Sequence, residues 1–278
     1  MATRPVSLTV FLLVASFAAA SGQTDRPITP DTVVVPSGPL HLRALLYQPP
    51  GPGPFPAVLF NHGTIADCVG PPDVLAFIGS FASAFVRHGY ALLFLTRRGD
   101  ALSADQGKCM GALLQAEAAK GLEARNHLLL VLLNTEQLDD VLAGLKFLRS
   151  LPKVNPGQIA IAGHSSGAML TLLAAERDTT LQAVVTFAAA AKNWEGSVDL
   201  QRRLLEATVK IRAPVMLVHA ADDSSTAPAY ALANELKRLR KPYVLKILGD
   251  HGHMAVFRAV PQWEPEVFRF LATYIPPR

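Results

Sequence analysis

The stretch that decides the fold runs Ile159-Ala160-Ile161-Ala162-Gly163-His164-Ser165-Ser166-Gly167. Its first four residues form a continuous apolar run, which is typical of a strand buried on both faces. A helical pattern begins directly after Gly167. A strand that turns sharply into a helix needs small residues around the turning position, and Gly163 and Gly167 supply them. We therefore predict Ser165 at the tip of a strained turn, with its hydroxyl exposed. The alternative is a structural turn with a bystander serine.

Strand-like and helix-like segments alternate along the rest of the chain. Similar apolar runs recur at 57–60, 91–95, 183–187, 215–218 and 244–247, after a predicted strand or hairpin at 33–35 and 42–47. Helical patterns cover 74–88, 135–150, 167–177, 227–240 and 265–274. This alternation predicts an α/β fold, with a mostly parallel central sheet and helices on both faces. We find no internal repeat, so one domain covering residues 23–278 is the expected organisation.

The composition excludes several classes of protein. Half of the 278 residues are hydrophobic and 17% are charged, which is apolar enough for a large core and excludes a disordered chain. The formal net charge is +4, but no dense Lys/Arg run with interleaved aromatic residues is present. We therefore expect no nucleic-acid partner.

The first 22 residues have the layout of a secretory signal peptide. Arg4 is followed by an apolar stretch from Val6 to Phe17 and then by small residues, with cleavage expected after Ala20 or Gly22. The apolar part is short for a bilayer span of about 20 residues, so no stable membrane insertion is expected after cleavage. The alternative is an uncleaved N-terminal anchor. We expect an exported protein, either periplasmic or secreted.

The chain contains two cysteines, Cys68 and Cys109. Disulfides survive in exported proteins, and both residues follow predicted neighbouring strands of the sheet. A disulfide between them is therefore expected, the alternative being two independent buried thiols. Their spacing does not suit a zinc site, and no other metal-ligand set is apparent.

Candidate acid and base residues follow the last two predicted strands. Asp222 and Asp223 come after 215–218, and His251 and His253 come after 244–247. A serine nucleophile needs a base, and the base needs an orienting carboxylate. The chain order of serine, aspartate and histidine is the one found where the nucleophile follows a buried strand of an α/β sheet. Position alone does not choose between the members of each pair.

The chain resembles α/β-hydrolases of the serine esterase type, in the dienelactone-hydrolase-like and prolyl-oligopeptidase-like branches. The resemblance extends from about residue 57 to the C-terminus and rests on five short motifs: Phe60-Asn61-His62-Gly63-Thr64, Arg97-Arg98-Gly99, the Ser165 turn, Asp222-Asp223 before Pro228, and Gly252-His253.

The resemblance implies a role for particular residues. Ser165 is expected as the nucleophile, Asp223 as the orienting acid and His253 as the base. The backbone N–H groups of Thr64 and Ser166 are expected to form the oxyanion hole. Dienelactone hydrolases themselves resemble the chain in fold but carry cysteine as the nucleophile, so their substrate is not implied here.

These residues predict an exported serine hydrolase that cleaves carboxylic esters through an acyl-enzyme on a Ser-Asp-His triad, without a cofactor. The alternatives are a small serine peptidase and a non-catalytic binding protein on the same fold. The expected substrate is a small-molecule ester or a short peptide. The segments 103–133 and 188–212 are expected over the carboxyl edge of the sheet, where ligands bind in such folds.

Two motifs of the resemblance have a structural and a functional interpretation. Arg97 and Arg98 either bind an anionic substrate or hold a loop through hydrogen bonds, and we favour the loop. His62 is expected to be a structural turn residue rather than a base.

Overall fold

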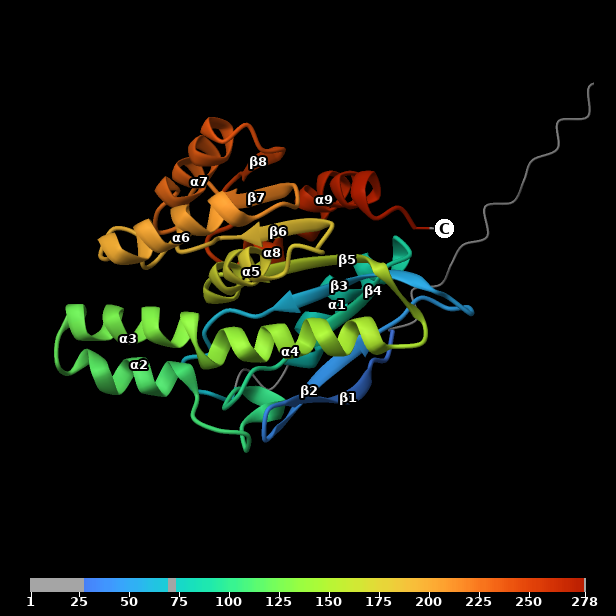
Figure 1. Ribbon diagram of the computed structural model, residues 1–278, viewed down its shortest axis with the longest axis horizontal. Helices are drawn as coiled ribbons and strands as arrows, with labels where there is room; N and C mark the ends of the chain where they lie inside the picture. The colour runs from blue at the N-terminus through green and yellow to red at the C-terminus, as the bar shows by residue number, and fades with distance from the viewer. Residues whose placement is uncertain (1–27, 70–73, 278) are drawn as a thin grey trace, which may run out of the picture.

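Strands and helices alternate in the computed structural model, which describes residues 28–69 and 74–277 (Figure 1). The strands are β1 (Asp31–Ser37), β2 (Leu40–Tyr47), β3 (Phe55–Asn61), β4 (Ala91–Leu95), β5 (Val154–His164), β6 (Ala183–Phe187), β7 (Val215–Ala220) and β8 (Tyr243–Leu248). The helices are α1 (Val74–Arg87), α2 (Met110–Ala118), α3 (Leu122–Asn134), α4 (Glu136–Ser150), α5 (Ser166–Arg177), α6 (Val198–Lys210), α7 (Ala227–Arg238), α8 (Ala255–Arg258) and α9 (Val260–Tyr274), with a short 3₁₀ helix η1 (Ala101–Ser103). Every predicted strand is present. The predicted signal peptide, residues 1–22, lies outside the described residues.

The strands form an eight-stranded sheet in the order β1-β2-β4-β3-β5-β6-β7-β8. β3 to β8 pair in parallel, and the β1–β2 hairpin joins β4 in antiparallel orientation. The prediction of a mostly parallel sheet is therefore confirmed. Because β3 and β5 to β8 run in one direction, the loops that follow them lie at the same edge of the sheet.

Strands β2 to β8 supply side chains to two hydrophobic layers. In β3, Ala57 and Leu59 face one layer, whereas Val58 and Phe60 face the other. This alternation follows from the two-residue period of a strand. Helices α4 to α7 cover the first layer, and α1, α8 and α9 cover the second (Figure 1). Helices on both faces explain why the central strands read as continuous apolar runs.

Helix α4 shows how the pattern of the sequence becomes packing. Leu138, Val141, Leu145 and Leu148 are at most 2% exposed, and they recur at the spacing of one helix face. Glu136 and Asp139 lie in the first turn and Arg149 in the last, which suits the helix dipole.

The two segments expected over the carboxyl edge differ from each other. Residues 103–133 contain α2 and α3, which lie side by side on the side to which the arrows of β3 and β6 point (Figure 1). In the segment 188–212, residues 188–197 form a loop and most of the remainder forms α6. Helix α6 packs against α5 and α7 and so belongs to the layer that covers the sheet.

The last helix begins earlier than predicted. α9 starts at Val260, whereas the sequence pattern predicts a start at Pro265, which lies inside the helix. Pro261 already occupies the first turn, and Pro265 follows one turn later. Among the described residues, no helix is both long and apolar enough to cross a membrane.

Candidate active site

Ser165 lies at the tip of a tight turn between β5 and α5. Its backbone angles are φ 56° and ψ −119°, a conformation that costs free energy in a non-glycine residue. The glycines on either side are required by close packing. A Cβ on Gly163 would lie 2.4 Å from the carbonyl oxygen of Gly167, and a Cβ on Gly167 would lie 2.2 Å from that of Asn61. The turn therefore holds the Ser165 side chain in one direction.

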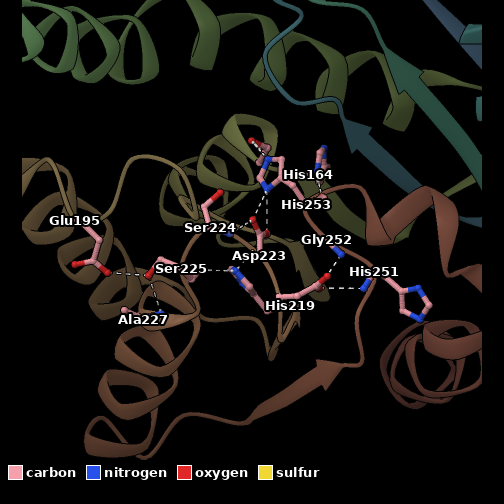
Figure 2. Close-up of polar contacts among 12 residues, drawn as sticks. His164, Glu195, His219, Asp223, Ser224, Ser225, Ala227, His251, Gly252 and His253 are labelled. Carbon is pink, nitrogen blue, oxygen red and sulfur yellow. Dashed lines mark hydrogen bonds and ion pairs between the residues drawn. The ribbon is translucent and has the colours of Figure 1, made fainter.

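The loops after β7 and β8 bring an aspartate and a histidine to this serine. His253 Nε2 lies 2.9 Å from Ser165 Oγ. On the other side of the ring, His253 Nδ1 lies 2.9 Å and 3.0 Å from the two carboxylate oxygens of Asp223 (Figure 2). The three side chains come from the ends of β5, β7 and β8, which are parallel and lie close together on one half of the sheet, with β6 between β5 and β7.

The Asp223 carboxylate is fully buried but well supplied with donors. It accepts a hydrogen bond from the backbone N–H of Ser224 at 2.6 Å, and His219 Nε2 lies 3.5 Å away. Burial alone would raise the pKa of Asp223. The hydrogen bond and the charge of His253 outweigh burial, so the pKa lies below its usual value. Asp223 is therefore ionised at neutral pH and can stabilise a positive charge on His253.

The loop after β3 approaches the serine from the other side. A Cβ on Gly63 would lie 3.1 Å from Ser165 Cβ, a tight contact that would push the two residues apart. Thr64 Oγ1 donates a hydrogen bond to Ser166 Oγ at 3.0 Å, which links the two residues expected to form the oxyanion hole. Ser166 is the first residue of α5, where the backbone N–H has no acceptor within the helix.

His62 and Arg97 orient the peptide that precedes Thr64. The backbone N–H of Arg97 donates to His62 Nε2 at 3.3 Å, so His62 Nδ1 carries the proton and donates to the Gly63 carbonyl at 2.7 Å. Burial holds the pKa of His62 well below its usual range, so the ring is neutral. Because the peptide is trans, the Thr64 N–H points away from this carbonyl.

The two arginines hold loops, as we favoured from the sequence. Arg97 is fully buried and donates to the His62 carbonyl and to Gln137. Arg98 donates from Nε and Nη2 to the two carboxylate oxygens of Asp140, which is itself buried. Neither guanidinium is therefore free for an anionic substrate.

Cys68 and Cys109 form the expected disulfide, with Cα atoms 5.6 Å apart. It joins the loop that carries Thr64 to the start of α2. Trp194 and Trp263 are 5% and 0% exposed, so both are core residues. No group of His, Cys, Asp or Glu side chains in residues 28–69 and 74–277 could hold a metal ion.

Two features of the site were missed at the level of sequence. His164 donates a hydrogen bond to the backbone of the loop that carries His253, and Asp222 binds that same loop. Both residues precede a predicted triad member in the chain, but this adjacency does not reveal what their side chains contact.

The strand order and the serine turn after β5 define the α/β-hydrolase fold. Within that class, the chain belongs to the dienelactone hydrolase family, whose model matches residues 42–260, more than half of the sequence. Membership supports an enzyme of the hydrolase type. A search of curated proteins found no match.

Several solved structures share the fold at low sequence identity. A dienelactone hydrolase from Anabaena variabilis is 17% identical, with a TM-score of 0.60, and the match covers 90% of this chain and 97% of that one. An acylaminoacyl peptidase from Pyrococcus horikoshii is also 17% identical, with a TM-score of 0.65, over 90% of this chain and 41% of that one. A puromycin-hydrolyzing peptidase from Mycobacterium tuberculosis is 16% identical, with a TM-score of 0.64, and the match covers 88% of this chain and 39% of that one. This chain therefore spans about two fifths of those peptidases.

Proposed function

We propose that this protein is a serine hydrolase that cleaves carboxylic esters through an acyl-enzyme on Ser165. The observation that carries the proposal is the hydrogen-bonded chain from Ser165 Oγ through the His253 ring to the buried Asp223 carboxylate. A serine hydroxyl is a weak nucleophile near neutral pH and needs such a base. The expected substrate is a small-molecule ester.

In the first half-reaction, His253 Nε2 takes the proton of Ser165 as Oγ attacks the ester carbonyl carbon. The carbonyl oxygen becomes an oxyanion and accepts hydrogen bonds from the Thr64 and Ser166 N–H groups. When the C–O bond breaks, His253 gives its proton to the leaving alcohol. In the second half-reaction, water attacks the acyl-enzyme, His253 takes its proton, and the carboxylic acid leaves as Oγ recovers a proton.

Labelling by a fluorophosphonate tests this proposal together with single substitutions. Ser165→Ala should abolish labelling and lower kcat for p-nitrophenyl esters by about 10⁶-fold, because both activation and attack act through that oxygen. His253→Ala should be similarly impaired, whereas His251→Ala should keep near-normal kcat. Retention of more than about a tenth of wild-type turnover by Ser165→Ala would show that the nucleophile lies elsewhere.

A serine peptidase is the competing enzyme class, and the structural likeness to acylaminoacyl peptidases favours it enough to test. A panel of p-nitrophenyl esters and aminoacyl amides separates the two. We expect kcat/KM to be higher for the esters, and a preference for aminoacyl amides would favour the peptidase. A wild-type protein that fails to react with the fluorophosphonate would instead point to a binding protein.

We also propose that the protein is exported after removal of residues 1–20 or 1–22. The apolar stretch between Arg4 and Ala20 supports this, and a disulfide is compatible with an oxidising compartment. Mass spectrometry of the protein recovered from extracytoplasmic fractions should find Ser21 or Gln23 at the N-terminus. Recovery of the chain with Arg4 intact in membranes would indicate an uncleaved anchor.

A further inference from the structure

Two side chains hold the backbone of the base loop, which we define as residues 249–254 between β8 and α8. Asp222 Oδ1 accepts hydrogen bonds from the backbone N–H groups of His251 at 3.0 Å and Gly252 at 2.7 Å. His164 Nε2 lies 2.8 Å from the backbone carbonyl oxygen of His253. The carboxylate thus binds the 250–251 and 251–252 peptide groups of this loop, and the imidazole binds the 253–254 peptide group. Figure 2 shows His164 beside His253, and His251 and Gly252 in the same loop.

His164 is a hydrogen-bond donor with a defined protonation state. A carbonyl oxygen only accepts, so Nε2 must carry the proton. The residue is 4% exposed, and burial, followed by the charge of His253, lowers its pKa to about 3. Nearby Lys192 also lowers this pKa, whereas Asp223 raises it. The ring is therefore neutral near pH 7 and does not compete with His253 for a proton.

The His164 ring is also packed between the loops of the site. Its centroid lies 4.8 Å from that of the His253 ring. On the other side, a Cβ on Gly63 would lie only 3.1 Å from His164 Nδ1. The imidazole therefore has little room to rotate away from the His253 carbonyl.

Asp222 binds the loop at a turn that presents two donors together. Gly252 has φ 61°, in the left-handed region, and such a turn directs successive N–H groups to one side, where they can bind an anion. The pKa of Asp222 lies below its usual value, chiefly because of the Gly252 N–H and also because of the His251 N–H. The side chain is exposed and ionised, and its position is set by these hydrogen bonds.

The base loop needs such support because of its place in the sheet. It follows β8, which is an edge strand and pairs only with β7. β5, which leads to Ser165, is flanked by strands on both sides. His253 must nevertheless reach Ser165 and Asp223 at the same time, and small displacements of a reacting group are costly.

We propose that His164 and Asp222 are positioning residues that hold the base loop, so that the His253 imidazole bridges Ser165 and Asp223. This inference rests on the proposed function, because it depends on His253 acting as the base. Each positioning residue directly precedes a triad member: His164 precedes the nucleophile, and Asp222 precedes the acid.

Two pairs of variants test the proposal. His164→Leu removes the donor and His164→Gln keeps one, whereas Asp222→Ala removes the acceptor and Asp222→Asn keeps one. We expect kcat for a p-nitrophenyl ester to fall by about 10- to 100-fold in the Leu and Ala variants, with KM within about twofold. The Gln and Asn variants should keep most of the wild-type kcat. Asp250→Ala, at an exposed aspartate of the same loop, is the matched control and should leave kcat unchanged.

The double variant His164→Leu/Asp222→Ala tests whether the two residues act on one loop. If they do, its loss of kcat should be smaller than the product of the two single losses. Folding of each variant is checked by thermal unfolding. If His164→Leu does not fold, the kcat values of His164→Gln and of the two Asp222 variants test the proposal instead.

Three outcomes would overturn the proposal: unchanged kcat in the Leu and Ala variants, an increase in KM alone, or equal losses in the conservative and non-conservative variants. Fluorophosphonate labelling of the wild-type protein distinguishes a failure of the positioning roles from a failure of the proposed function. If Ser165 of the wild-type protein is not labelled, the proposed function fails and this inference fails with it. If it is labelled at the same rate in all variants, only the positioning roles are wrong.

Discussion

Asp222 and Asp223 are neighbours in the chain, yet their carboxylates bind different partners. Asp223 lies against the His253 ring with its carboxylate fully buried, whereas Asp222 is exposed and binds backbone N–H groups of the base loop. A charge that must stabilise an imidazolium is most effective where water is excluded, so burial favours Asp223 as the acid. Asp222 instead holds the backbone of the loop that carries His253.

We expect Asp223→Asn to lower kcat far more than Asp222→Asn. Loss of the Asp223 charge removes the group that orients the His253 ring and stabilises its protonated form, which costs on the order of 10⁴-fold in another triad. Asp222→Asn retains an oxygen that can accept from the Gly252 N–H, so its loss should be within a few fold. Ester turnover by the two folded variants decides, and a larger loss in Asp222→Asn would exchange the two assignments.

At the scale of elements, the disulfide joins parts of the chain that the sheet does not. Cys68 lies in the loop after β3, and Cys109 precedes the first residue of α2, at a sequence separation of 41. The carbonyl of Cys68 accepts a hydrogen bond from Ala101 at 2.8 Å. Together, the disulfide and this hydrogen bond connect the loop that carries Thr64 to the segment from η1 to α2.

We expect reduction of this disulfide to destabilise the protein by about 4 kcal/mol, the chain-entropy value for a loop of this length. The free energy of unfolding in urea, measured with and without dithiothreitol, gives the difference. The Cys68→Ser/Cys109→Ser variant is the control, because it should have the lower stability without reductant and show no further change with it. Equal stability of the oxidised and reduced wild-type protein would contradict this expectation.

At the scale of the whole molecule, two buried aspartates near Arg97 and Arg98 differ in how many hydrogen-bond partners their carboxylates have. Asp140 is paired with Arg98 and accepts from Ser37, whereas both carboxylate oxygens of Asp100 are buried without a hydrogen-bond partner in the described part of the chain. Burial raises the pKa of Asp100 to about 6, against an opposing effect of Arg97. Folding therefore favours the protonated form of Asp100.

This raised pKa predicts how stability depends on pH. Between its unfolded value of 3.8 and about 6, the folded protein binds more protons than the unfolded chain, so the Asp100 contribution is lost as pH rises through that window. The shift corresponds to a destabilisation on the order of 3 kcal/mol above pH 6. Asp100→Asn mimics the protonated form, so its stability relative to wild type should improve between pH 4 and pH 7.5. Urea unfolding at the two pH values tests this, and a difference independent of pH would rule it out.

Much of the architecture was predictable from the sequence because it depends on local patterns. Continuous apolar runs mark strands covered on both faces, and the stripe on α4 marks a face that packs on the sheet. The glycines around Ser165 mark a turn that larger residues would block. The predicted start of α9 at Pro265 was wrong, because the helix already begins at Val260 with Pro261 in its first turn.

The site was only partly predictable, because its contacts join residues far apart in the chain. Ser165 and His253 are separated by 88 positions, and Asp223 and His253 by 30. Spacing along the sequence located the loops but left the choice within each Asp and His pair to the family resemblance. The direction of each side chain depends on the parallel packing of β5, β7 and β8.

The sequence by itself determined which segments form strands and helices, and where a serine turn must lie, because these depend on residue size, hydrophobic period and backbone freedom over a few positions. Only the tertiary structure decided that Asp223 is buried against His253 while Asp222 and His164 bind the base loop. The physical reason is that hydrogen bonds between distant segments depend on loop conformation and burial, which no local pattern specifies.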